Sequence, residues 1–266
     1  MSERAYRWDS EDYARHSSAQ KEWALELIDQ LGLQATEQVL DIGCGDGKVT
    51  AALAVRVPGG GVLGLDSSPE MVERARRTYP ADLYPNLRFQ LGDALELDFE
   101  ERFDAAFSNA ALHWVSGHLR VLRGTGRALR RGGRLLFQMG GRGNARAILG
   151  ILEELGRERP WDAWLADFPC PYSFYGPEEY RGWLEQAGLQ VRRVELLPKE
   201  MRQQGPEGLA GWVRTTWLPY TQAVPAERRE ELVAQLVGRY LRGHPPDADG
   251  AVRVEMVRLE VEACRQ

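Results

Sequence analysis

The sequence predicts an α/β fold in which strands and helices alternate around a ligand site, with additional helices forming a cap. Two observations lead to this prediction. An apolar strand at 39–42 runs into a glycine-rich turn and then into residues 48–57, whose apolar positions recur at helical spacing. The alternation of strands and helices continues to residue 139, and two later stretches rich in aromatic residues interrupt it.

The turn within residues 39–47, which read VLDIGCGDG, is the clearest sign of a ligand site. Glycines at such a turn let the backbone adopt positive φ angles and approach a ligand closely, and the following helix N-terminus offers unpaired N–H groups. We therefore expect an anionic or strongly polar ligand there. A dinucleotide site requires G-x-G-x-x-G, but Lys48 stands where the third glycine would be. A turn that only connects the strand to the helix is the alternative.

A carboxylate ends the next predicted strand, at 61–66. Asp66 follows the glycine turn by about 20 residues, which is where an acidic residue binds the ribose hydroxyls in nucleotide-type sites. The segment 67–70 then opens a helix through a serine cap and an early proline. Met71, just inside this helix, can pack on an adenine ring or simply in the core.

Polar residues also follow the next two predicted strands, at 87–91 and 103–109. Asp93 comes shortly after the first strand, Asn109 ends the second, and His113 lies in the loop beyond it. Because the carboxyl ends of parallel strands meet at the crevice where ligands bind, we expect these side chains in the site region. Capping a turn or the following helix is the alternative role for Asp93.

The other predicted elements follow from apolar spacing and from helix-stop signals. A helix capped by Ser17 or Ser18 ends at Gly32, and the segment at 6–16 before it is an arm or a short helix. The rest are a helix at 119–129, a strand at 134–139, a helix at 177–187, a strand at 189–196, helices at 207–217 and 225–242, and a strand at 251–264. The alternation of this last strand slips near residues 256 and 257, as a β-bulge would cause.

The chain length of 266 residues is enough to bury one core plus a cap without disulfides or metals, so we expect one compact unit. Its predicted parts are an N-terminal arm and helix at 1–34, a core at 35–140, a first cap insertion at 141–176, further core at 177–197, a second, helical cap insertion at 198–250 and the final core strand at 251–266.

Composition narrows the class of protein. The net charge of −5 gives no global positive field for nucleic acid or an acidic membrane. Cys44, Cys170 and Cys264 are far apart and lack C-x-x-C spacing, which argues against a disulfide framework or a zinc site and fits a reducing cytoplasm. The segment 1–13 is charged and aromatic, and no apolar run approaches eighteen residues, so neither export nor membrane insertion is indicated.

The D-x-G-x-G-x-G pattern at 41–47 resembles motif I of the class I S-adenosylmethionine-dependent methyltransferases. The order of elements is similar to the Rossmann-like, seven-stranded sheet of that superfamily, whose last strand is antiparallel. The resemblance covers about residues 35–197 and 251–264. It implies S-adenosyl-L-methionine as cofactor, with S-adenosyl-L-homocysteine as product.

The resemblance also implies roles for the strand-end residues. In that superfamily the acid of motif I faces the amino-acid part of the cofactor, and the acid after the third strand accepts from the adenine amino group while neighbouring backbone meets a ring nitrogen. The implied cofactor-binding residues of this chain are Asp41, Gly43, Cys44, Gly45, Asp66, Ser67, Met71, Asp93, Ala94, Asn109 and Trp114. The carboxylates of Asp41, Asp66 and Asp93 would stabilise a cationic sulfonium, whereas they would repel a pyrophosphate.

Within the superfamily, the segment SNAALHWV at 108–115 looks like the trans-aconitate methyltransferase group, whose relatives methylate malonyl acyl-carrier protein; both act on carboxylates. The segments at 172–180 and 212–220 resemble the trans-aconitate methyltransferases more than the enzymes that methylate malonyl acyl-carrier protein. The segment at 13–20 differs from the trans-aconitate methyltransferases. The resemblance therefore implies O-methylation of a carboxylate on a small molecule.

Methyl transfer to a carboxylate oxygen requires no general base, because the nucleophile is already ionised at neutral pH. The site then needs a cation or hydrogen-bond donors to hold the acid. Arg142 and Arg214 are the candidates, although either can simply be solvated. His113 can orient a substrate oxygen or act as a base, and its alternative is to hydrogen-bond the cap loop. Aromatic assistance is expected from Tyr172, Tyr175, Trp217 and Tyr220.

Other functions remain compatible with the sequence. The acceptor atom can instead be a hydroxyl, an amine or a carbon of another small molecule. An NAD-type oxidoreductase and a cofactor-binding module without catalysis are the alternatives from other classes. The sequence does not identify the acceptor, because the cap and not the sheet determines the substrate. The oligomeric state is equally open.

Overall fold

The computed structural model describes residues 18–266, with side chains from Trp23 onward. The predicted arm at 6–16 and the cap at Ser17 therefore lie outside the described residues. Two compact units appear where the sequence predicted one: a sheet unit of Gln20–Arg142, Tyr172–Leu197 and Val257–Gln266, and a helical unit that includes Gly143–Pro171 and Pro198–Met256. The single-unit prediction was wrong because the inserted segments bury aromatic side chains of their own.

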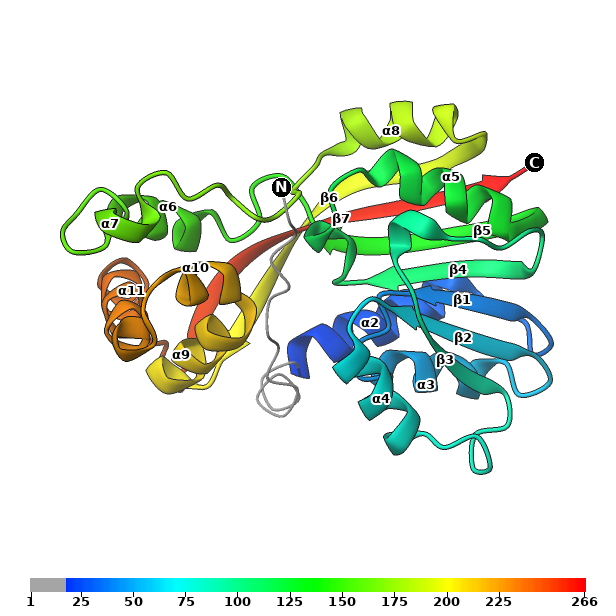
Figure 1. Cartoon of the computed structure of the whole chain (residues 1–266), viewed down its shortest axis with the longest axis horizontal. Helices are drawn as coiled ribbons and strands as arrows, with labels where there is room; N and C mark the ends of the chain where they lie inside the picture. Colours follow the sequence, from blue (N-terminus) through cyan, green and yellow to red (C-terminus); the bar gives the residue numbers. More distant parts are fainter. Residues whose placement is uncertain (1–17) are drawn as a thin grey trace. The chain divides into compact units, whose positions relative to one another are not determined.

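The sheet has seven strands in the order β3-β2-β1-β4-β5-β7-β6 (Figure 1). The pairs β1–β2, β1–β4, β2–β3 and β4–β5 are parallel, whereas β5 and β7 pair antiparallel, as the resemblance implied. The strands are β1 (Gln38–Ile42), β2 (Gly61–Asp66), β3 (Leu87–Leu91), β4 (Phe103–Asn109), β5 (Leu129–Gly140), β6 (Leu189–Gln203) and β7 (Val252–Arg265).

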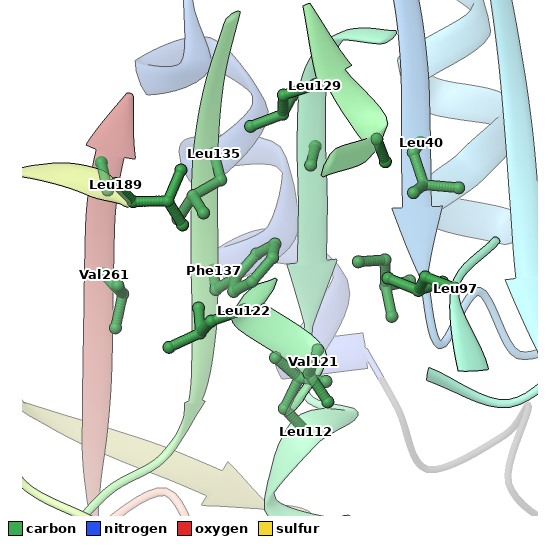
Figure 2. Packing of buried hydrophobic residues seen from close by; sticks show 14 of the residues in the cluster. Leu40, Leu97, Leu112, Val121, Leu122, Leu129, Leu135, Phe137, Leu189 and Val261 are labelled. Carbon is green, nitrogen blue, oxygen red and sulfur yellow. The ribbon is translucent and has the colours of Figure 1, made fainter. Parts of the chain in front are cut away.

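Helices cover both faces of the sheet unit. Alternate residues of each strand point to opposite faces, so β5 directs Leu135 and Phe137 to one face and Leu136 to the other. Figure 2 shows Phe137 in the first cluster beside Leu122 of α5. The helices α5 (His118–Ala128) and α8 (Pro177–Gln186) pack on this first face, and α2 (Ser18–Leu31), α3 (Lys48–Arg56) and α4 (Pro69–Thr78) pack on the second.

The helical unit has a core of large aromatic side chains. Trp161, Trp212, Trp217 and Tyr240 are each almost completely buried, and the Trp161 Nε1–H donates to Gln235 Oε1 at 3.0 Å. Its helices are α6 (Arg146–Leu155), α7 (Asp162–Leu165), α9 (Gly205–Thr216), α10 (Leu218–Ala223) and α11 (Arg229–Gly243). The sequence did not predict α10, a helix of only six residues.

The slip in alternation along β7 coincides with a change in burial. Val252, Val254 and Met256 are buried on alternate positions, but every residue from 258 to 261 is buried. Pairing with β5 continues without a shift of register from Arg258 to Cys264. The change falls where the strand leaves the helical unit, after Met256, and enters the sheet unit, in which both faces are covered. Residues 256 and 257 lie outside this paired stretch, so the β-bulge stays a prediction, and Arg258 lies in the buried part of the strand.

Candidate functional site

The glycine turn connects β1 to α3 in a left-handed backbone conformation, with φ of 79° at Gly43, 53° at Gly45 and 83° at Gly47. The N–H groups of Gly43 and Cys44 donate to the carbonyl oxygen of Leu65 at 2.7 and 3.0 Å. The Gly45 N–H donates to Asp66 Oδ2 at 2.8 Å. The turn is thereby fixed to the carboxyl end of β2.

Each glycine of the turn is required for a different reason. A Cβ at Gly43 would lie 2.2 Å from the Cβ of Ala111, and one at Gly47 would lie 2.6 Å from the Phe89 ring. A Cβ at Gly45 would meet no protein atom within 4 Å, so this residue borders open space. Gly43 and Gly47 therefore serve packing, whereas Gly45 leaves its backbone accessible to a ligand.

Asp41 is a buried carboxyl group at the end of β1, with only 2% of its surface exposed. The hydroxyl of Thr50 in α3 donates to Asp41 Oδ2 at 2.7 Å. Burial raises the pKa of Asp41 to about 7; the Thr50 hydrogen bond opposes this shift and the nearby charge of Asp66 adds to it. Burial likewise raises the pKa of the Cys44 thiol well above its usual value, so Cys44 is not a reactive thiolate.

Asp66 joins two elements through one carboxylate. Besides the Gly45 N–H, it accepts the Ser68 N–H at 2.9 Å through Oδ1. Ser68 caps α4 by accepting the Met71 N–H at 3.3 Å, which confirms the predicted serine cap. Burial raises the pKa of Asp66, and the backbone hydrogen bonds oppose that rise. Ser67 is exposed and Met71 is buried at 5% exposure.

Asp93 caps a short 3-10 helix, η1 (Ala94–Glu96), by accepting the Leu95 N–H at 2.8 Å. The capping role that the sequence offered as an alternative is therefore present. A carboxylate has about four acceptor sites, so this bond leaves capacity for a ligand. A role of Asp93 and Ala94 toward adenine stays a prediction.

The loop after β4 is strained next to Asn109. Ala110 has φ of 55°, a conformation that costs a non-glycine residue roughly 1–2 kcal/mol. Its N–H donates to the carbonyl oxygen of Gln138 at 2.8 Å, which keeps the loop against β5. Strained residues of this kind cluster at functional sites. Asn109 itself is half-buried.

His113 lies in the 3-10 helix η2 (Leu112–Trp114) and is only 7% exposed. Its Nδ1 accepts the Gly140 N–H at 3.4 Å, so the proton of the neutral ring is on Nε2. The Ser173 N–H donates to its backbone oxygen at 2.8 Å. Burial lowers the pKa of His113 to about 3, and the charges of Arg258 and His118 contribute. The imidazole is therefore neutral and a weak base.

Aromatic rings surround His113. The ring centroids of Trp114, Tyr172 and Phe174 lie 5.7, 6.2 and 5.9 Å from that of the imidazole. Tyr172 and Phe174 stack on each other with centroids 5.3 Å apart. Residues 172–176 belong to the sheet unit, although the sequence placed them in the cap.

The two predicted substrate-binding arginines are each bound to glutamates. Arg142, in the sheet unit, pairs with Glu178 at 3.2 Å and with Glu179. Arg214, in the helical unit, forms a bidentate pair with Glu230 through contacts of 2.9 and 2.7 Å. Their role toward a substrate stays a prediction.

Sequence reasoning missed several residues at this edge of the sheet. Thr50 and Gln138 carry no motif, and Ala111 lies in the segment 108–115 but was given no role. The roles of all three depend on contacts between distant segments. Arg258 was overlooked because charged residues in a terminal strand usually face solvent. The slip in alternation just before Arg258 was the signal that could have found it.

Metal-ligating side chains do not cluster within residues 18–266. Among them, no three histidine, cysteine, aspartate or glutamate side chains gather as metal ligands would. Likewise, none of the helices described has the length and apolar character needed to cross a membrane.

Comparison with known proteins places the chain in a family. The methyltransferase domain family matches residues 39–133. A trans-aconitate 2-methyltransferase of Methylobacterium nodulans is 31% identical over 97% of this chain and 98% of its own length. The chain belongs to the class I S-adenosylmethionine-dependent methyltransferases. The trans-aconitate 2-methyltransferase of Methylobacterium radiotolerans is 30% identical, covering 96% of the methyltransferase and 97% of the relative.

Solved structures of other proteins have a similar fold. The YcgJ protein of Bacillus subtilis aligns with a TM-score of 0.61 and 20% identity, over 92% of the methyltransferase and 99% of that chain. The Haemonchus contortus phosphoethanolamine N-methyltransferase 2, in complex with S-adenosylhomocysteine, aligns with a TM-score of 0.58 and 18% identity. The alignment covers 92% of the methyltransferase and 52% of that chain.

S-adenosyl-L-methionine is the cofactor of the methyltransferase, and the residues present fit it. Gly45 borders open space, and the buried carboxyl of Asp41 and the half-buried carboxyl of Asp66 lie on either side of the turn, where a cation would stabilise them. Which of the predicted residues touch the cofactor stays a proposal.

Replacing Gly45 by alanine should weaken binding of S-adenosylhomocysteine at least tenfold, because the added methyl group would enter the space beside the turn. The matched control is Gly132→Ala: Gly132 has φ of 78°, and a Cβ there would also meet no atom within 4 Å, so the backbone strain is similar. Calorimetry of both variants checks this. Equal affinities of the two variants for S-adenosylhomocysteine would show that Gly45 does not border the bound cofactor.

Cofactor affinity should depend on the protonation of Asp41. A bound cation favours the ionised carboxylate, so below the raised pKa of about 7 binding must release a proton. The affinity of the wild type for S-adenosylmethionine should therefore rise by up to about tenfold from pH 6 to 7 and level off above that. The Asp41→Asn variant should lack this rise in affinity. Titration of the ligand itself affects both proteins equally, so it cancels when the two profiles are compared. Parallel pH profiles would contradict the assignment.

Proposed function

We propose that the methyltransferase transfers a methyl group to a carboxylate oxygen of a small organic acid, with trans-aconitate as the first candidate. Support comes from the full-length relatives named trans-aconitate 2-methyltransferase. The segments at 108–115 and 172–180, which resemble that group, meet in the aromatic cluster around His113.

The burial of His113, which is only 7% exposed, is the observation that carries the proposal, because burial disfavours the charged form of the ring. A hydroxyl or ammonium acceptor must lose a proton before or during attack, and an efficient base has a pKa near the working pH. The pKa of His113 is lowered to about 3, which leaves it a poor proton acceptor. A carboxylic acid, with a pKa near 4, arrives already ionised. The site therefore suits a carboxylate better than the alternative acceptors.

The cofactor, when bound, supplies a methyl group activated on a positively charged sulfur. The protein then has to align the acceptor oxygen with that methyl group and to exclude water. The two reacting charges neutralise each other as the bond forms, so a site of low polarity does not penalise the reaction. The aromatic rings around His113 provide such surroundings, and His113, protonated on Nε2, can donate to an acceptor oxygen.

We further propose that the enzyme works in the cytoplasm on a free small molecule and not on nucleic acid. The net charge of −5 provides no general attraction to phosphate backbones. The unpaired spacing of the three cysteines suits a reducing compartment.

A pH–rate study of the wild type and His113→Asn, with trans-aconitate and with hydroxyl and amine acceptors, tests the proposal. We expect methyl ester formation from the acid only, and a rate loss below about tenfold in the variant, because general-base catalysis contributes about 10²–10⁴-fold. The two pH profiles should have the same shape. A limb between pH 6 and 8 that disappears in His113→Asn would establish a base and overturn the proposal.

A further inference from the structure

Thr50 carries a completely buried hydroxyl in the first turn of α3, with 0% of the residue exposed. A threonine hydroxyl in a helix can bond back to a carbonyl oxygen four residues earlier, as Thr125 of α5 does with Val121 at 2.9 Å. The Thr50 hydroxyl instead donates to Asp41 Oδ2 at 2.7 Å. An apolar residue of the same shape would fill this space equally well, so packing alone does not account for the hydroxyl.

The carboxylate of Asp41 depends on this one bond. Among the residues that the structure describes, only Thr50 donates a hydrogen bond to it, and the bond engages Oδ2 and not Oδ1. A buried carboxylate is costly to keep charged unless hydrogen bonds or a cation compensate it. A ligand with a positive charge and N–H donors would complete that compensation at Oδ1.

The strands on either side of β1 provide no positive charge to Asp41. Its register partners are Gly64 on β2 and Phe107 on β4, and neither is charged. Asp66, at the end of β2, is negative when ionised and so opposes the ionisation of Asp41. The neighbouring strands therefore favour the neutral acid.

The turn and the helix after β1 add a thiol and an ion pair. The Cys44 thiol is neutral, because burial raises its pKa well above the usual value. Lys48, in the first turn of α3, pairs with Asp46 at 3.1 Å. Of the groups that act on the pKa of Asp41, the Thr50 hydroxyl is the one that favours the charged carboxylate.

We propose that Thr50 is a positioning residue of the cofactor site: its hydroxyl holds Asp41 Oδ2, keeps the carboxylate charged near neutral pH and leaves Oδ1 for the cation of the cofactor. The inference rests on the proposed contact between Asp41 and the cofactor, and it is independent of which acceptor is methylated. A hydrogen bond to a charged group contributes more than one to a neutral group, so removal of the hydroxyl favours the neutral acid. Binding of the cation must then displace a proton up to a higher pH.

The pH dependence of cofactor binding tests this role of Thr50. The affinity of the wild type and of Thr50→Val for S-adenosylmethionine is measured by calorimetry from pH 6 to pH 9. Loss of a hydrogen bond to a charged group should move the plateau of affinity upward by about one to two pH units in Thr50→Val. The variant should therefore bind roughly 10- to 100-fold more weakly than the wild type at pH 6, and within about threefold of it at pH 9.

Three variants separate this role from a loss of packing. Thr125→Val is the matched control, because it removes an equally buried hydroxyl from the same unit without touching a carboxylate; its pH profile should be that of the wild type. Thr50→Ser keeps a hydroxyl and should restore the wild-type profile. In the Asp41→Asn background, Thr50→Val should change affinity by less than about threefold at every pH, because the group through which it acts is gone.

Thr50→Ala carries the test if Thr50→Val does not fold, and thermal unfolding of each variant reports folding. An unchanged profile in Thr50→Val, a loss of affinity that is the same at every pH, or a loss that persists in the Asp41→Asn background would overturn the inference. A wild-type pH profile that Asp41→Asn leaves unchanged would instead reject the contact between Asp41 and the cofactor, and the role of Thr50 with it. Methyl transfer to a carboxylate is measured separately, by ester formation.

Discussion

The hydrogen bond from the Gly45 N–H to the carboxylate of Asp66 is the interaction on which the rest of the site depends. It joins the turn after β1 to the end of β2, and the same carboxylate holds the first turn of α4 through Ser68. With the turn fixed, Gly43 can approach Ala111 so closely that no Cβ fits between them. The ends of three strands are thereby held in one arrangement before any ligand binds, which is the preorganisation that alignment of two substrates requires.

The electrostatics of the cofactor site suit a cation. The carboxyl of Asp41 is buried and that of Asp66 is half-buried, and the pKa values of both are raised, so a positively charged ligand beside them would be stabilised. On the β5–β7 side the two buried residues Arg258 and Glu260 carry opposite charges. A sulfonium matches the carboxyls of Asp41 and Asp66, and a pyrophosphate does not.

The parts predicted well from sequence are those with a local signal. The bounds of β2, β3 and β4 agree with the predicted strands, and the serine cap of α4 is present, because strand alternation and capping are properties of short segments. The extension of β6 to Gln203, the short helix α10 and the division into two units were missed, since each depends on packing between segments distant in sequence. The same reason explains why Arg258 was missed: its burial shows only in the folded β7.

The identity of the atom that receives the methyl group decides the account most directly. The enzyme is supplied with trans-aconitate and with S-adenosylmethionine labelled with ¹³C in the transferred methyl, and the product is analysed by heteronuclear NMR. We predict a three-bond correlation from the labelled methyl protons to a carboxyl carbon, the signature of a methyl ester. A labelled methyl attached to carbon, nitrogen or an ether oxygen, or no transfer to any carboxylic acid, would contradict the account.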